Sequence, residues 1–141
     1  MTPLYDLAVR LNVVANYAFC PRNGQTFCND YASVFCAARG VVLPPVVADD
    51  QLGYLSTSPE WTEIGKLEAV TRANAGQLVL AVADSATLKQ NHGHIVALVE
   101  SPDTNPSGCF VTAAGARNAV RCPLDQQFGA IQPRFFVSDV A

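Results

Sequence analysis

The sequence predicts an α+β domain in which helices pack on a small antiparallel sheet. Apolar residues repeat at helical spacing in the first half of the chain. After Gly76, segments rich in Val, Leu, Ile and Phe are separated by turn residues, which is typical of strands. Helices followed by strands indicate an α+β domain with an antiparallel sheet. The 141 residues fit one core, so residues 1–141 are expected to form a single domain.

Three helices are expected in the first half of the chain. The first lies between Leu4 and Phe19, where apolar residues follow helical spacing. The second covers Thr26 to Arg39, with Thr26 as its cap and Gly40 as the left-handed residue that ends it. The third starts at Ser58–Pro59–Glu60, because proline suits the first helical position, and runs to Ala73. Residues 41–59, which contain three prolines, are expected to be mostly loop.

Four strands are expected after the helices. Each is a short run of β-branched, aromatic and leucine residues bounded by Gly, Pro, Asn or Asp. The predicted strands are Gln77–Ala83, His94–Glu100, Cys109–Ala114 and Arg134–Val140.

Composition and charge exclude several classes of partner. The net charge is −3, and Lys and Arg do not cluster, so the sequence gives no support for nucleic-acid binding. The longest apolar runs, 78–83 and 95–99, are too short to span a bilayer. Asp6 and Arg10 interrupt the apolar N-terminal segment, so no standard secretory signal is visible.

The five cysteines are an odd number, so at most two disulfides can form and at least one thiol stays free. Cys109 and Cys122 lie 13 residues apart and could pair in an oxidising compartment. Pairing of Cys20 with Cys36 is also open. The chain has no CxxC pair and only two histidines, so a structural zinc site is not expected. No metal or other cofactor is predicted.

Cys28 and His94 are the candidate catalytic pair. Cys28 falls in the first turn of the second predicted helix, where the helix N-terminus favours a thiolate, whereas Cys36 lies deep inside that helix. His94 opens the apolar strand HIVALVE and is the candidate base, while His92 belongs to the preceding loop. Free cysteines are also among the most buried residues, so Cys28 could equally be a packing residue. Spacing alone does not decide between these two interpretations.

Three short strings add a resemblance to a known family. In order, they are FCNDYASVF around Cys28, AGQLVLAV at the first predicted strand and HGHIVALV around His94. In this order they resemble the NlpC-type cell-wall peptidases, a papain-like superfamily. With GVVLPP at 40–45, the pattern is most similar to the compact amidase effectors of type VI secretion. The resemblance covers roughly residues 24 to 115. Phe27 and Asn29–Asp30 depart from the family's pattern around the cysteine.

The resemblance implies a papain-like fold and a cysteine amidase that hydrolyses bacterial peptidoglycan stem peptides without a cofactor. Cys28 would be the nucleophile and His94 the base. Family practice places a third polar residue on the next strand, where this sequence offers Thr112, although a backbone carbonyl could serve instead. The protein would be secreted or delivered to the bacterial periplasm or cell wall. The substrate would lie in a groove between the start of the second helix and the sheet, and an immunity protein would inhibit the enzyme by covering that groove.

Two alternatives remain open at the level of sequence. The first is a CHAP-type lysin amidase, which uses the same cysteine and histidine logic. The second is a catalytically inert papain-like module that binds a partner, in which Cys28 packs in the core and His94 is incidental.

Overall fold

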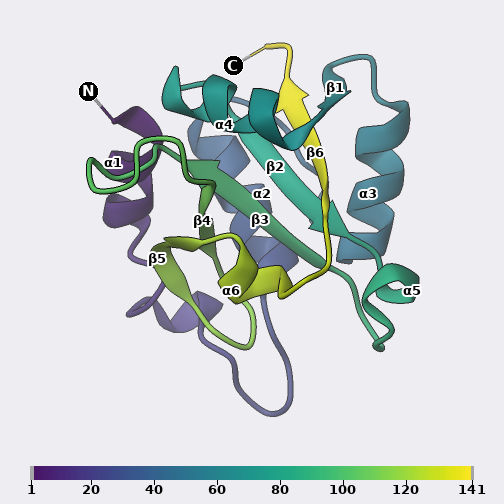
Figure 1. The fold of residues 1–141 in the computed structure, drawn as a ribbon. Helices are drawn as coiled ribbons and strands as arrows, with labels where there is room; N and C mark the ends of the chain where they lie inside the picture. The colour runs from purple at the N-terminus through teal and green to yellow at the C-terminus, as the bar shows by residue number, and fades with distance from the viewer. Residues whose placement is uncertain (1, 141) are drawn as a thin grey trace.

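A computed structural model describes residues 2–140, in which six strands form one antiparallel sheet (Figure 1). Along the sheet the strands follow the order β1-β6-β2-β3-β4-β5. The α+β class and the small antiparallel sheet predicted from the sequence are confirmed. The strands are β1 (Trp61–Ile64), β2 (Val79–Ala83), β3 (His94–Val99), β4 (Phe110–Ala113), β5 (Ala119–Pro123) and β6 (Arg134–Ser138).

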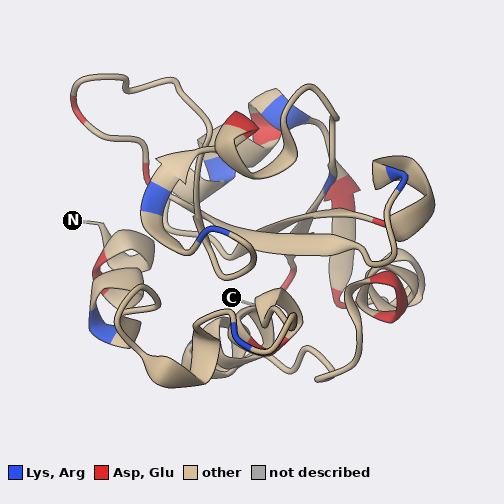
Figure 2. Cartoon of the chain, turned by 90° about the horizontal axis from the view of Figure 1, so that it is seen from below, with Lys and Arg blue, Asp and Glu red and all other residues tan. Residues whose placement is uncertain are grey.

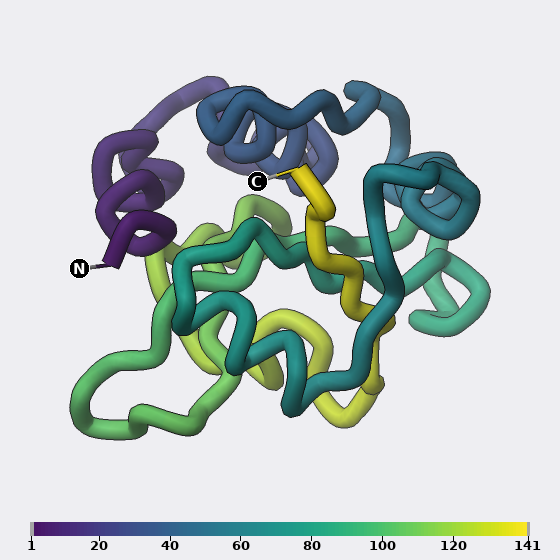
Figure 3. The backbone as a smooth tube through the Cα atoms, turned by 90° about the horizontal axis from the view of Figure 1, so that it is seen from above, coloured from purple at the N-terminus to yellow at the C-terminus, as the bar shows by residue number. Residues whose placement is uncertain are grey.

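Helices cover both faces of the sheet. Figure 3 shows α1, α2 and α3 in a row on one side of the sheet and α4 on the other. In agreement, α2 and α3 contact β3, and α4 contacts β3 and β6. The helices are α1 (Pro3–Leu11), α2 (Cys28–Ala38), α3 (Ala48–Thr57), α4 (Lys66–Asn74), α5 (Ser85–Leu88) and α6 (Asp125–Phe128), with a 3-10 turn at Tyr17–Phe19.

The central strands β2 and β3 form the middle of the core. All five residues of β2 are buried, as are the last five residues of β3. Strands covered by helices on both faces read as continuous apolar runs rather than as alternating ones. VLAVA and IVALV follow this pattern. His94, the first residue of β3, is only partly buried, so it lies where the apolar core gives way to the cleft described below.

The first two predicted helices are present with different ends. The first is shorter than predicted, because it ends at Leu11 and Asn12 adopts a left-handed conformation with φ of 51°. The prediction that Thr26 caps the second helix is wrong, since Phe27 occupies the cap position and makes no side-chain cap bond. Gly40 has φ of +76°, which confirms its role at the end of that helix.

Residues 41–66 differ most from the prediction. The expected loop contains α3, whose buried face includes Gln51, Leu52 and Leu55. The second half of the helix predicted from residue 58 to Ala73 is present as α4, whereas its first half is the strand β1. Trp61 explains the difference, because it is 5% exposed in β1, which pairs with β6 in a register that places Trp61 opposite Ser138. Tertiary pairing overrides the local helix signal here. Strand β5 was also not predicted.

A buried carboxylate ties α1 to the sheet. Glu100 is 4% exposed, and its two oxygens accept hydrogen bonds from the backbone N–H groups of Leu4 (3.1 Å) and Tyr5 (2.8 Å). These donors belong to the first turn of α1, whose own cap residue Thr2 makes no side-chain cap bond. A carboxylate at a helix N-terminus is stabilising, so Glu100 serves the fold at the opposite end of β3 from His94.

The positions of Lys and Arg and those of Asp and Glu are scattered through the fold (Figure 2). Two ion pairs join them among residues 2–140, Arg72 with Glu68 and Arg134 with Glu63, each at 2.8 Å. Over the same residues, no helix has both the length and the apolar character needed to span a membrane.

Candidate active site

Cys28 is the first residue of α2 and lies against β3. Its side chain is 6% exposed, and burial raises the pKa of its thiol. Backbone N–H groups act in the opposite direction on this pKa, with that of Ile95 contributing most and that of Asn29 next. Its position at a helix start would by itself lower the pKa of the Cys28 thiol, but the loss of solvent around the buried sulfur raises this pKa by more. The resting thiol is therefore protonated near neutral pH.

The second cysteine of α2 is a core residue, as predicted. Cys36 has no exposed surface, and burial raises the pKa of its thiol to about 12. It lies two helical turns beyond Cys28, away from the helix start. Both cysteines belong to the buried core, but Cys28 also lines a cavity.

His94 is held by two residues of α6. Its Nε2 lies 2.8 Å from Oε1 of Gln127, and its ring packs on Phe128 with ring centroids 5.1 Å apart. Burial lowers the pKa of the imidazole, while the bond to Gln127 acts to raise it and the nearby His92 to lower it. Burial dominates, so the resting imidazole is neutral near pH 7.

The bonds of Gln127 fix which ring nitrogen carries the proton. Its Nε2 donates to the carbonyl oxygen of Arg117 at 3.0 Å, so its Oε1 is the atom that faces His94. An amide oxygen accepts hydrogen bonds only, and therefore Nε2 of the neutral imidazole must be the N–H donor. Nδ1 is then left with a free lone pair. A neutral imidazole in this form can accept a proton from a thiol.

Thr112 does not serve the imidazole in this structure. Its hydroxyl lies 2.8 Å from the hydroxyl of Tyr31 and donates to the carbonyl oxygen of Ala119 at 3.2 Å. In the register of β3 and β4, Thr112 faces Ala97, three residues along the strand from His94. The polar contact that sequence reasoning assigned to Thr112 is made by Gln127 instead.

A glycine leaves room for the imidazole. A Cβ atom built on Gly115 would lie 2.9 Å from Cε1 of His94, closer than such atoms approach in practice. The N–H of Gly115 donates to Oδ1 of Asn118 at 2.9 Å, and Nδ2 of Asn118 donates to the carbonyl oxygens of Val13 and Phe19. This network holds the turn between β4 and β5 beside the imidazole.

Two adjoining cavities meet at the cysteine and the histidine. The first, of about 390 Å³, is lined by Cys28, and the second, of about 470 Å³, is lined by His94. Thr26 and His92 line both cavities, so the two form one cleft. A cleft with a thiol in one part and an imidazole in the other can accommodate a substrate that extends in both directions.

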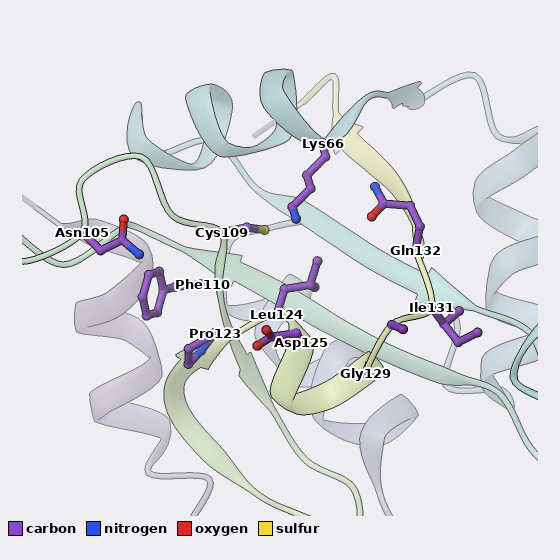
Figure 4. A pocket seen from close by; sticks show the side chains of 11 residues that line it. Lys66, Asn105, Cys109, Phe110, Pro123, Leu124, Asp125, Gly129, Ile131 and Gln132 are labelled. Carbon is purple, nitrogen blue, oxygen red and sulfur yellow. The ribbon is translucent and has the colours of Figure 1, made fainter.

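A separate cavity of about 330 Å³ lies between α4, β4 and the segment that joins α6 to β6. Figure 4 shows the Lys66 amine directed into it, above Leu124 and near Cys109. Burial raises the pKa of the Cys109 thiol to about 11, although the Lys66 charge acts to lower it. Its lining residues contain neither Cys28 nor His94, so this cavity is distinct from the candidate active site.

The remaining cysteines are all thiols. Neither proposed disulfide is formed, since Cys20, Cys36, Cys109 and Cys122 are free. Within residues 2–140, no three His, Cys, Asp or Glu side chains gather in a way that would hold a metal ion.

Sequence reasoning missed Gln127 and Gly115. Gln127 lies on a four-residue helix that has no amphipathic pattern of its own, and its contact with His94 spans 33 positions. Gly115 belongs to the string TAAGA, where a glycine reads only as a turn residue. Neither position carries a local signal for the site.

Comparison of the chain with models of known protein families gives no match, and comparison with curated proteins gives none either. The fold and the cleft by themselves describe an α+β protein in which a cysteine and a histidine line adjoining parts of one cleft.

Proposed function

We propose that the protein is a cysteine hydrolase that cleaves amide bonds in bacterial peptidoglycan stem peptides, on a papain-like fold of the NlpC type. The observation that carries this proposal is the imidazole of His94, bound through Nε2 to Gln127, at the start of the strand against which Cys28 lies. This arrangement provides a nucleophile, a base and a group that orients the base, which are the three requirements of thiol catalysis.

The states of the two groups oppose a resting thiolate–imidazolium pair, so proton transfer would accompany the attack rather than precede it. The raised pKa of Cys28 and the lowered pKa of His94 both favour a neutral thiol and a neutral imidazole at rest. The thiol would pass its proton to Nδ1 of His94 as Sγ bonds to the carbonyl carbon of the amide. The carbonyl electrons would move to its oxygen, which the backbone N–H of Cys28 would stabilise.

The second half of the proposed reaction releases the amine and the acid. The C–N bond breaks and His94 gives its proton to the leaving amine, so a thioester remains on Cys28. Water, deprotonated by His94, then attacks the thioester carbonyl. The C–S bond breaks, and the thiol regains its proton. These steps need no cofactor.

The substrate and the place of action rest on the resemblance to the NlpC-type peptidases. The strings around Cys28 and His94 are its main support, together with the order of helices and strands between them. On this basis the protein acts in the bacterial periplasm or cell wall, after secretion or delivery. An immunity protein would inhibit it by covering the cleft.

A second candidate is a catalytically inert papain-like module. The specific observation in its favour is the burial of Cys28, whose side chain is only 6% exposed and whose thiol pKa is raised. In this alternative the cleft binds a peptide without cutting it. A CHAP-type amidase is a further variant of the hydrolase proposal, with the same roles for Cys28 and His94.

Purified muropeptides test the proposal directly. We expect the wild-type protein to cleave them, with the bond identified from product masses, and expect Cys28→Ala and His94→Ala to lose nearly all activity. The matched control is Cys36→Ala, a cysteine in the same helix that lies in the core. It should keep its kcat while losing about 1 kcal/mol of stability.

The outcomes separate the two candidates. Cleavage that is equal in the wild type and in Cys28→Ala would rule out the cysteine mechanism. Binding of muropeptides by the wild type without any cleavage would instead support the inert module. Thermal unfolding of each variant shows whether a loss of activity reflects a loss of folded protein.

A further inference from the structure

The two cavities of the cleft differ in the reacting group that lines them. Cys28 lines the first cavity, whereas His94 lines the second. In the proposed hydrolysis, the acyl half of the substrate stays on the Cys28 sulfur and the amine half leaves with a proton from His94. The acyl half therefore lies in the first cavity, here called the acyl cavity, and the amine half in the second, here called the amine cavity.

Each cavity is lined by one charged residue, and the two residues have opposite charge. Among the Asp, Glu, Lys and Arg residues of the described chain, Asp30 alone lines the acyl cavity. Among the same four residue types in the described chain, Arg117 alone lines the amine cavity. The other polar residues of the cleft are amides, a threonine and the two histidines. The cleft is therefore negative at one end and positive at the other.

Both charged residues are near the reacting groups. Asp30 follows Cys28 by two residues in the first turn of α2, and its charge acts to raise the pKa of the Cys28 thiol. The carbonyl oxygen of Arg117 accepts a hydrogen bond from Gln127, the residue whose amide oxygen binds His94. A substrate whose scissile bond lies between the thiol and the imidazole would thus extend toward both charges.

Two other charged residues near the cleft, Arg22 and Asp49, bind partners of their own. The guanidinium of Arg22 stacks on Phe27 with 4.3 Å to the ring centroid, and it donates to the carbonyl oxygens of Tyr17 and Cys20. Asp49 lies behind Gly93, where its carboxylate accepts hydrogen bonds from the N–H and hydroxyl of Ser85. Neither Asp30 nor Arg117 belongs to the two ion pairs of residues 2–140.

We infer, on the basis of the proposed hydrolase function, that the cleft selects a peptide whose acyl half carries a free amine and whose amine half carries a carboxylate. Asp30 binds the amine and Arg117 binds the carboxylate. Charge complementarity of this kind fixes the direction of a ligand in a cleft. The preferred substrates are therefore peptides with a free amine before the cleaved bond and a free carboxylate after it.

Four versions of one synthetic tetrapeptide of stem-peptide sequence test this inference. The amino terminus is either free or acetylated, and the carboxyl terminus is either free or amidated. We expect the version with both termini free to have the highest kcat/KM, and each capping step to lower kcat/KM by about 2- to 5-fold, as for partly exposed charge pairs. Capping the amino terminus should have no effect in Asp30→Asn, and capping the carboxyl terminus none in Arg117→Gln.

The control variant is Arg121→Gln. Arg121 stacks on Tyr5 of α1, 4.0 Å from the ring centroid, and does not line the cleft. It should show the same preference among the four peptides as the wild type. Arg117→Gln keeps the backbone carbonyl that accepts from Gln127, so its effect reports on the guanidinium alone.

A binding measurement separates this inference from the proposed hydrolysis. NMR titration of Cys28→Ala with the same four peptides reports affinity without turnover. If the wild type cleaves no peptide but the version with both termini free binds about 2- to 5-fold more tightly than each singly capped version, the hydrolase proposal fails and the assignment of the two charges stands. Equal affinity for all four peptides, or a preference that survives both Asp30→Asn and Arg117→Gln, would overturn the inference.

Discussion

The imidazole of His94 and the side-chain amide of Gln127 are joined by a 2.8 Å hydrogen bond across 33 positions of the sequence. The amide is itself fixed, because its Nε2 donates to the carbonyl oxygen of Arg117. The bond therefore sets both the orientation of the ring and the nitrogen that carries its proton. This relationship leads to the first prediction.

Gln127→Ala should lower kcat by about 10- to 100-fold with little change in KM, because His94 loses the group that fixes its tautomer. Hydrolysis of muropeptides measures the effect. Gln126→Ala is the matched control, since Gln126 lines the same cavity and precedes Gln127 in α6. If both variants keep wild-type kcat, Gln127 has no positioning role.

Thr112→Val should lower the stability of the protein rather than its kcat. It removes the hydroxyl that pairs with Tyr31, whose phenol is buried and has its pKa raised by that burial to about 12. Leaving the Tyr31 hydroxyl without this partner should cost about 1 to 3 kcal/mol in the free energy of unfolding. Urea denaturation measures the loss, and Thr112→Ser should retain most of the stability. We expect kcat to stay unchanged in both variants, so a large drop in the kcat of folded Thr112→Val that Thr112→Ser does not share would contradict a purely structural role.

Gly115→Ala should displace the imidazole. The added Cβ would lie 2.9 Å from Cε1 of His94, so the ring or the turn must move, at a cost of about 1 to 3 kcal/mol. We expect kcat to fall by about tenfold or more as the bond to Gln127 is disturbed. Gly53→Ala is the control, because nothing lies within 4 Å of the added atom and the site is inside α3. It should stabilise the protein by about 0.5 to 1 kcal/mol. Equal kcat in the two variants would show that the contact with His94 is not critical.

The stability of the protein should fall as the pH drops below about 6.5. Burial keeps the pKa of His94 in the folded protein below its ordinary value of 6.5, so the unfolded chain takes up a proton first as the pH falls. The contribution of neutral His94 to the free energy of unfolding is thus complete above its pKa in the unfolded chain. It is lost as the pH falls through its pKa in the folded protein. Urea midpoints at pH 7.5 and pH 5 would reveal the loss.

The contribution of His94 to this pH dependence can be isolated by substitution. His94→Gln should show a smaller difference between the two urea midpoints than the wild type, while His92→Gln keeps most of the wild-type difference. His92 is exposed, whereas His94, two positions later, is partly buried. The two variants therefore compare neighbouring histidines that differ in burial. An unchanged pH dependence in His94→Gln would assign the effect to other groups.

The elements that carry Cys28 and His94 could be predicted from the sequence because their signals are local. An apolar stripe and Gly40 mark α2, and the run HIVALV marks a buried strand. The short edge strand β1 could not be predicted in this way, because its order depends on pairing with β6, more than 70 residues later. Gln127 was missed for the same reason, since its role exists only through a contact with a distant residue. Local pattern thus located the elements of the candidate pair but not Gln127, which binds the imidazole.

The position of β6 has a consequence for the timing of assembly. This strand comes after every other strand in the sequence, yet it lies between β1 and β2 in the sheet. During synthesis, both of these partners must wait with unpaired edges until residues 134–138 leave the ribosome. Gln127 and α6 also emerge only shortly before that point. A nascent chain therefore holds Cys28 and His94 long before Gln127 can bind the imidazole, and the sheet behind the cleft is completed only when β6 has been made.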